Sequence, residues 1–167
     1  MREAEVEADE DARLYSEGPA RLLAALLAVL SLAGIGASGY LTYVHWFDKS
    51  IVCAGLHSCA QVAESDYAWI GGVPVAFLGL LGYVALAAVS AFWLRAGNRF
   101  DVWPLLAIWG IGVAGVAYSA YLTYVELFVI DAVCIWCVTS AAIMSVIFLA
   151  STAGLLTLGR DSELLAG

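Results

Sequence analysis

Four long apolar runs constrain this chain more than any other feature of its sequence. They cover residues 22–44, 73–94, 103–125 and 134–158. Each is long enough to cross the hydrocarbon core of a bilayer, which needs about 20 residues in a helix. The composition agrees, because 63% of the 167 residues are hydrophobic and only seven are basic. We therefore expect an all-α integral membrane protein, a bundle of four transmembrane helices surrounded mainly by lipid.

The basic residues indicate how such a bundle is oriented. One side of it would carry six arginines and the other only Lys49; the six are Arg2, Arg13, Arg21, Arg95, Arg99 and Arg160. Basic residues concentrate on the cytoplasmic side of membrane proteins. We expect a multi-pass protein of the cytoplasmic (inner) membrane, with both termini and the 95–101 turn in the cytoplasm. The 45–72 loop and the 126–133 turn would then be extracytoplasmic.

Charge also divides the chain into three parts. Residues 1–17 contain seven acids and two arginines, a composition typical of a solvated, disordered segment. We expect residues 1–18 to form an acidic cytoplasmic tail and residues 19–159 to form the four-helix membrane domain. Residues 160–167 would be a short cytoplasmic C-terminal tail.

The chain contains an internal repeat. A shift of 81 residues aligns 38–53 with 119–134 without a gap, and it places the same pentapeptide, Tyr-Leu-Thr-Tyr-Val, at 40–44 and 121–125. Gly34 falls on Gly115 in the same register. Scattered Leu and Val matches arise easily in apolar helices, but a shared Tyr-x-x-Tyr followed by a Cys does not. The repeat predicts two helical hairpins joined through the cytoplasmic turn.

The segments between the apolar runs also predict local structure. Residues 58–69, between the first two apolar runs, contain Ser, Asp and aromatic residues, and we expect a short broken or interfacial helix lying over the bundle. The next helix should start near Gly71-Gly72-Val73-Pro74, with Pro74 in its first turn. Asp131 precedes the fourth apolar run and is expected to cap that helix.

The four cysteines form two pairs in different settings. Cys53 and Cys59 lie in the outward loop, whereas Cys134 and Cys137 begin the fourth apolar run. The second pair is one helical turn apart on one face, close enough to form a disulfide. The N-terminus of a helix favours a thiolate, which is the reactive form of cysteine. We expect Cys134 and Cys137 to be reactive.

Three interpretations fit two cysteine pairs. A zinc site matches the known ligand spacings poorly. Structural disulfides are common in exported loops and remain an alternative. An electron relay uses both pairs: a soluble dithiol would reduce the loop pair, which would exchange with the helix pair, which would reduce an acceptor in the membrane. Because the chain has no haem-attachment motif and no nucleotide fingerprint, we expect a quinone as the acceptor, and no metal, haem or flavin.

Several of these motifs together resemble a known family. They are the loop cysteines, Ser65 six residues after Cys59, the Gly72-x-Pro74…Gly79 start of the second helix, and Tyr121-Leu-Thr-Tyr124 followed by Cys134-Ile-Trp-Cys137. In this combination the chain resembles the vitamin K epoxide reductase family over about residues 22–155.

The resemblance implies a four-helix bundle around a quinone pocket that the outward loop caps. It implies that Cys53 meets a thioredoxin-like partner, that Cys59 exchanges with Cys134, and that Cys137 faces the quinone. The family's loop serine corresponds to Ser65, which the resemblance implies as a contact of the quinone.

Three further residues are expected near this pocket. Phe77 and Trp136 are large aromatic groups that suit a flat ring, so we expect them to contact the quinone. Asp131 is expected to support the Cys134 thiolate through the start of the helix.

Two departures from the family pattern bear on the substrate. Vertebrate members carry an Asn and a Tyr that bond the quinone carbonyls, and those positions correspond here to Val75 and Ala141. The resemblance therefore favours the bacterial branch: a thiol:quinone oxidoreductase that uses menaquinone or ubiquinone as substrate. Its partner would be a separate extracytoplasmic thioredoxin-like thiol oxidase that forms disulfides in exported proteins, and no nucleic acid is expected. A quinone or quinone-epoxide reductase and a disulfide-stapled scaffold remain alternatives.

The other polar and aromatic residues at the outer ends of the helices are expected to be ordinary interfacial groups. We expect His45 and His57 to be solvated, and Glu126 to be an interfacial charge just beyond the third helix. Aromatic belts explain the tyrosines of both repeats, Tyr40, Tyr43, Tyr121 and Tyr124.

Overall fold

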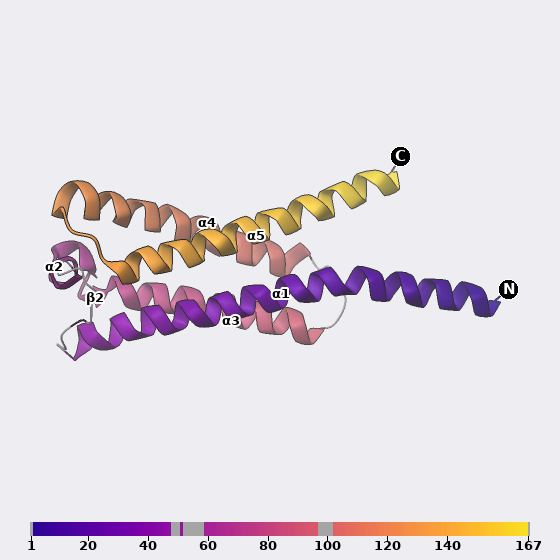
Figure 1. Cartoon of the computed structure of the whole chain (residues 1–167), viewed down its shortest axis with the longest axis horizontal. Coiled ribbons are helices and arrows are strands. Elements are labelled where there is room, and N and C mark those ends of the chain that lie inside the picture. Colours follow the sequence, from indigo (N-terminus) through magenta and orange to yellow (C-terminus); the bar gives the residue numbers. More distant parts are fainter. Residues whose placement is uncertain (1, 48–50, 52–58, 97–101, 167) are drawn as a thin grey trace.

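The computed structural model describes residues 2–47, 51, 59–96 and 102–166. Four residues named above, Lys49, Cys53, His57 and Arg99, lie outside the described residues. Four long helices run side by side along the molecule (Figure 1). They are α1 (Arg2–Trp46), α3 (Val75–Ala96), α4 (Val102–Val125) and α5 (Ile135–Ala166).

Within the described residues, four segments are long and apolar enough to cross a membrane; three lie within α1, α3 and α5, and the fourth comprises α4 and the π-helical turn η2 (Glu126–Ile130) that follows it. These segments are Gly18–Trp46, Val75–Arg95, Val102–Ile130 and Ile135–Arg160. They start and end within a few residues of the four apolar runs, so the prediction of an all-α bundle with four membrane-spanning helices is confirmed. Sequence hydropathy succeeds here because lipid cannot satisfy a backbone polar group, which leaves the helix as the structure that an isolated apolar segment can adopt.

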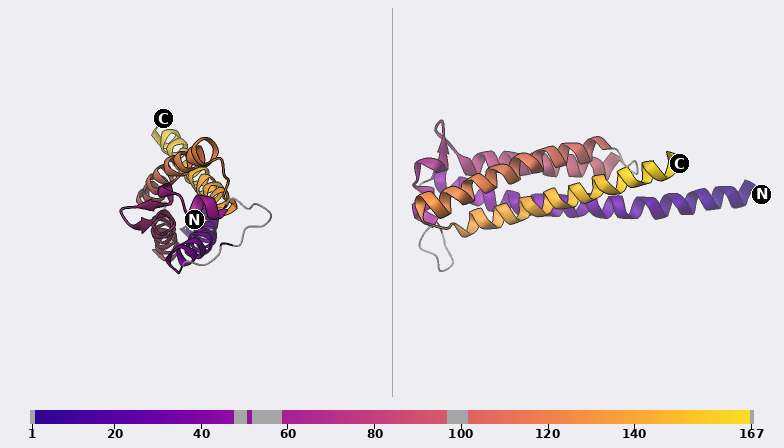
Figure 2. Two further views of the ribbon diagram at one scale, coloured as in Figure 1. Left: turned by 90° about the vertical axis from the view of Figure 1, so that its left-hand side faces the viewer. Right: turned by 90° about the horizontal axis from the view of Figure 1, so that it is seen from above.

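The helices pair as the internal repeat predicts. Helix α1 packs mainly against α3, and α4 packs mainly against α5, so each repeat forms one hairpin. The contacts of α1 with α5 and of α3 with α4 join the two hairpins into a bundle (Figure 2). Both termini lie at one end of this bundle, and the segment that contains α2 lies at the opposite end (Figure 1).

Helix α1 extends well beyond the membrane-spanning segment. It begins at Arg2, so the acidic segment that we expected to be disordered is helical in the structure. The segment is rich in Ala and Glu, which have good helix propensity. Pro19 lies inside the helix, where it removes one backbone hydrogen bond next to the start of the apolar segment at Gly18. The division of the chain into a cytoplasmic tail and a membrane domain stays a prediction.

Short elements cover the end of the bundle that is remote from the termini. Helix α2 (Cys59–Ala63) and the 3-10 helix η1 (Asp66–Ala68) form the broken helix that the sequence predicts between the first two spans. Strands β1 (Trp69–Ile70) and β2 (Val73–Pro74) then form an antiparallel hairpin. Its turn residues, Gly71 and Gly72, have φ values of 58° and 84°, which glycine adopts without strain.

This hairpin corrects the expected start of the second membrane helix. Pro74 is not in the first turn of a helix; it pairs with Trp69, and α3 begins at Val75. A proline fits the edge of a two-stranded hairpin as well as it fits a first helical turn, since neither position requires its N–H to donate. The sequence Gly71-Gly72-Val73-Pro74 is therefore compatible with both a hairpin and a helix start, and it did not distinguish them.

Tyr83 of α3 connects three of the four helices. Its side chain is fully buried, and its ring packs onto α1 at Gly34, where an added Cβ would overlap the ring. The Tyr83 hydroxyl donates to the carbonyl oxygen of Ser140 in α5 at 2.8 Å and lies 3.0 Å from the Ser140 hydroxyl. The equivalent glycine of the second repeat, Gly115, accommodates Met144 of α5 in a similar way. Both repeats thus use a glycine to allow close contact within their hairpin.

We predict that Gly34→Ala destabilises the bundle, because the new methyl group would displace the Tyr83 ring. Overpacking of this kind costs about 1–3 kcal/mol. Gly36→Ala is the matched control, since nothing lies within 4 Å of a Cβ at that position. Its effect should be neutral or slightly stabilising, given that Ala favours a helix over Gly by up to about 1 kcal/mol. Thermal unfolding of the two variants in detergent measures the difference, and equal Tm values would contradict the role of Gly34.

Candidate functional site

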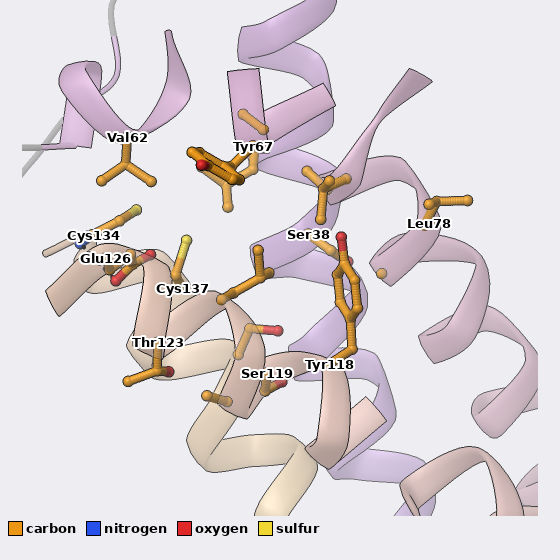
Figure 3. Close-up of a pocket in the computed structure, with 18 of the residues that line it drawn as sticks. Ser38, Val62, Tyr67, Leu78, Tyr118, Ser119, Thr123, Glu126, Cys134 and Cys137 are labelled. Atoms are coloured by element: carbon orange, nitrogen blue, oxygen red, sulfur yellow. Dashed lines mark hydrogen bonds between the residues drawn. The ribbon is translucent and has the colours of Figure 1, made fainter. Parts of the chain in front are cut away.

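A cavity of about 360 Å³ lies at the end of the bundle that α2 and η1 cover. All four membrane helices and the short elements α2, η1 and η2 (Glu126–Ile130) contribute to its walls. The walls are mainly apolar, and the reactive groups on them are Cys59, Glu126, Cys134 and Cys137. Figure 3 shows Glu126, Cys134 and Cys137 close together on one side of the cavity and Tyr118 on the other.

Cys134 and Cys137 occupy the start of α5. Cys134 immediately precedes the helix, and its carbonyl accepts the N–H of Val138 at 3.0 Å, as the residue before a helix does. Cys137 lies in the first turn. Both are free thiols, hydrogen-bonded to each other, with Cys134 2% exposed and Cys137 half-buried. The predicted dithiol at a helix start is therefore present in its reduced form.

The environment of Cys134 favours its thiolate. A hydrogen bond from the Cys137 thiol is the largest influence and lowers the pKa of Cys134. Burial raises it, the backbone N–H groups of Cys137 and Trp136 lower it, and the charge of Glu126 raises it. The balance lowers the pKa of Cys134 to about 7. At neutral pH a large share of Cys134 is thus ionised, and Cys137 is the thiol that donates to it.

Cys59 lines the same cavity and belongs to helix α2. It is the first residue of α2, is fully buried, and is disulfide-bonded. Helix α2 contacts the segment before Cys134, and the side-chain amide of Gln61 lies 3.5 Å from the Ile130 carbonyl. The structure thus places Cys59 and Cys134 on one cavity, although 75 residues separate them in sequence (134 − 59). Cys53 lies outside the described residues.

Glu126 is a site residue that the sequence analysis missed. The expectation that it is a solvated interfacial charge is wrong, since the side chain is only 4% exposed. Its Oε2 atom accepts the backbone N–H of Cys134 at 3.3 Å, and its carboxyl group is also hydrogen-bonded with the Cys137 thiol. The 81-residue repeat contained one signal for it: Glu126 aligns with His45, which also lines the cavity.

A π-helical turn holds Glu126 in this position. Residues Glu126–Ile130 form η2, which continues α4, and π-helical turns of this kind are frequent at functional sites. The Glu126 carbonyl accepts the N–H groups of Asp131 and Ala132, the latter at 3.0 Å. The backbone and the side chain of Glu126 therefore both fix the 131–134 segment that leads to the dithiol.

The expected role of Asp131 is not supported by its position. Asp131 ends η2 with φ 53°, in the left-handed region, and its side chain is exposed. Helix α5 begins only at Ile135, so Asp131 is too far away to cap it. The carboxylate that reaches the Cys134 N–H belongs to Glu126 instead. The sequence pattern identified a carboxylate at the helix start but selected the wrong residue.

Of the residues expected to contact a ring-shaped ligand, Ser65 lines the cavity and the two aromatic residues do not. The Ser65 hydroxyl donates to the Val62 carbonyl at 2.7 Å and makes no capping bond to η1. Phe77 instead packs against Trp46, with ring centroids 5.1 Å apart. Trp136 packs against Tyr40, with centroids 4.7 Å apart.

Comparisons with known proteins agree with the geometry. A family model described as the vitamin K epoxide reductase family matches residues 25–152, which include all four cysteines. The thiol-disulfide oxidoreductase LTO1 of Arabidopsis thaliana is 30% identical over 119 residues, an alignment that covers 68% of this chain and 32% of that protein. The chain thus matches about a third of the length of this curated relative.

We predict that Cys137→Ala raises the pKa of Cys134, because it removes the hydrogen bond that most stabilises the thiolate. The ultraviolet absorbance of the thiolate, followed against pH, measures the shift. In the wild type the thiolate should form around pH 7, and in the variant at clearly higher pH. Thr139→Ala is the control, since this residue of the same turn is exposed and its hydroxyl donates to the Ile135 carbonyl. An unchanged titration in Cys137→Ala would contradict the assigned cause.

Proposed function

The chain belongs to the vitamin K epoxide reductase family, and from this premise we propose that it is a membrane thiol:quinone oxidoreductase. It oxidises a reduced thioredoxin-like protein and passes the electrons through two cysteine pairs to a quinone. The observation that carries the proposal is a single cavity lined both by the disulfide-bonded Cys59 and by the free thiols of Cys134 and Cys137. Its effect would be to support disulfide formation in exported proteins.

The burial of Cys59 supports a particular order of electron flow. Its side chain has no exposed surface, so a protein partner has no access to its sulfur. On our proposal the partner's thiolate attacks Cys53, the other member of the loop pair, and Cys59 leaves as a thiolate. The partner's second thiol then releases the partner as a disulfide and leaves Cys53 and Cys59 reduced. Two electrons have entered the loop pair.

The next two steps follow from the positions of the thiols. The Cys59 thiolate attacks Cys134 in an oxidised Cys134–Cys137 pair, and Cys53 resolves the mixed disulfide, which restores the loop disulfide. Cys134 and Cys137 are then both reduced, as the structure has them. Oxidation of this dithiol back to a disulfide releases two electrons and two protons for the acceptor.

The cavity walls suit a quinone. Small-molecule sites are mostly apolar cavities of about 300–1,000 Å³ with a few placed polar groups. This cavity falls within that range, and Tyr67, Tyr118 and Ser119 offer hydroxyl groups among apolar side chains. Val75 and Ala141 also line it, which leaves apolar groups where vertebrate relatives bond quinone carbonyls. When bound, a quinone would supply an acceptor for two electrons and two protons.

The free thiols of Cys134 and Cys137 also favour the relay over a scaffold in which both pairs are structural disulfides. We further propose that the end of the bundle with the cysteines faces the extracytoplasmic side. Both termini lie at the opposite end, where Arg21, Arg95 and Arg160 border the membrane-spanning segments. Basic residues concentrate on the cytoplasmic side, so the termini are assigned to the cytoplasm.

Cys59→Ala should abolish quinone reduction driven by a protein dithiol, because it removes the link between the loop pair and the helix pair. Purified protein is mixed with a reduced thioredoxin-like protein and a soluble quinone analogue, and the ultraviolet absorbance of the quinone is followed. The wild type should consume quinone and the variant should not, while Gly36→Ala serves as a control at a position that does not line the cavity. The absence of quinone loss in folded wild type would refute the proposal.

Cys137→Ser should block quinone reduction and leave the exchange between the partner and the loop pair intact. Without the Cys137 thiol, the helix side has no disulfide for Cys59 to attack, so electrons from the partner should remain in the loop pair as the thiols of Cys53 and Cys59. Alkylation trapping followed by peptide mass spectrometry identifies these two thiols. Quinone reduction at the wild-type rate in this variant would show that the assigned order of electron flow is wrong.

A further inference from the structure

Glu126 is a buried carboxyl group beside the dithiol, and the relay described above does not use it. It lines the cavity, is 4% exposed, and is the only Asp or Glu among the described residues on the cavity wall. It is hydrogen-bonded to both cysteines, through the Cys134 N–H at 3.3 Å and through the Cys137 thiol. No ion pair between Glu126 and a basic side chain occurs within the part of the chain that the structure describes.

Burial of this group needs an explanation. A carboxylate in an apolar environment is costly unless it is paired or accepts several hydrogen bonds, and ionisable groups inside membrane proteins are generally functional. The bond to the Cys134 N–H does not require a charge, because the amide oxygen of a glutamine could accept it equally well. What a carboxyl group adds, and an amide lacks, is the ability to take up and release a proton. In the reduced pair the single hydrogen of the Cys137 thiol is donated to the Cys134 sulfur. Glu126 contacts the same thiol and can take this proton once Cys134 loses its negative charge as the disulfide forms.

We infer that Glu126 carries the proton of the Cys137 thiol to the quinone when the dithiol is oxidised. The inference rests on the proposed function, since it concerns the last step of that relay. Glu126 is positioned for both halves of the transfer: it is hydrogen-bonded with the thiol that gives the proton, and it borders the cavity that accommodates the acceptor.

The step balances in atoms and electrons. Cys134 reacts as its thiolate, having released its proton to water, whereas Cys137 still carries one. As the bond between the two sulfurs forms, the Cys137 S–H bond breaks, Glu126 takes the proton, and two electrons pass to the quinone. Glu126 then releases this proton to one quinone oxygen and returns to its carboxylate form. Water supplies the second proton, equal to the one that Cys134 released.

The internal repeat shows that the carboxyl group belongs to only one half of the bundle. The position equivalent to Glu126 in the first repeat is His45, whose Nδ1 atom lies 2.7 Å from the carbonyl oxygen of Leu41. The acid thus occurs in the repeat that carries the helical dithiol, where oxidation releases a thiol proton. This placement agrees with a role in that step rather than in general packing.

The test is a single-turnover experiment on the full chain. Fully reduced protein, freed of excess reductant, is mixed rapidly with a short-tail ubiquinone analogue, and the absorbance of the quinone is followed. Loss of a general acid or base costs about 10²–10⁴ in rate, so Glu126→Gln should slow the reaction by at least about 100-fold. Glu64→Gln is the matched control: it removes an exposed carboxylate that does not line the cavity, and the rate should not change.

The pH profile separates proton transfer from a merely structural role. A protonated Glu126 cannot accept the Cys137 proton, so the wild-type rate should fall as the pH is lowered through the titration of this carboxyl group. Because the Cys134 thiolate is also lost as the pH is lowered, the comparison is made on the rate per Cys134 thiolate. The fall in this rate should be missing in Glu126→Gln and retained in Glu126→Asp. All variants retain the other titratable groups that line the cavity, which are His45, Cys59, Tyr67, Tyr83, Tyr118, Cys134 and Cys137. The charge of Glu126 raises the pKa of Cys134, so the thiolate absorbance is titrated in each variant to obtain the rate per thiolate. A structural role of Glu126 predicts the same fractional loss at every pH.

The outcomes distinguish the two proposals. If the wild type does not reduce the quinone, the proposed function fails. If the wild type reduces it and Glu126→Gln is equally fast, the relay stands and proton transfer by Glu126 is wrong. If Glu126→Gln does not fold, Glu126→Asp decides: its carboxylate is withdrawn by one methylene, a displacement that should cost between about 10- and 100-fold while the pH dependence remains. A wild-type rate in Glu126→Asp would then overturn the inference.

Discussion

The contact of Tyr83 with Gly34 and Ser140 sets the geometry on which the site depends. Lipid tails are as apolar as the side chains of the helices, so helices in a membrane associate through close packing and hydrogen bonds rather than through the hydrophobic effect. Tyr83 provides both, because its ring lies against the bare backbone of α1 and its hydroxyl bonds to α5. Ser140 is one helical turn beyond Cys137. The contact therefore fixes where the dithiol lies relative to the first hairpin.

The cysteines of the site differ in protonation state and in oxidation state. Cys134 lies at the start of α5, where N–H groups and the Cys137 thiol favour its thiolate, and Cys137 acts as the donor. Glu126 adds a hydrogen-bonded carboxyl group on the same wall, held by the π-helical turn that ends α4. Cys59 faces these groups from α2 in an oxidised, fully buried state. Burial makes these hydrogen bonds more influential than they would be in water.

The sequence predicted the features that depend on local pattern. A membrane-spanning helix satisfies its own backbone and needs only a long apolar run, so the four spans were found within a few residues. The hairpin pairing followed from the 81-residue repeat, and the position of the dithiol at a helix start followed from two cysteines one turn apart. The short helices over the bundle were predicted from a polar interruption between apolar runs.

The sequence by itself determined the number of spans, their pairing and the position of the dithiol. The spans and the dithiol depend on residues close together in the chain, and the pairing follows from the internal repeat. Only the tertiary structure decided that Glu126 is buried against the thiols while Asp131 is exposed, since both are acids in the same short connection and only contacts with α5 distinguish them. The tertiary structure also places Phe77 and Trp136 against aromatic residues of α1 rather than in the cavity. Which face of a helix packs against a neighbouring helix depends on segments far apart in the chain, so a local sequence pattern cannot predict it.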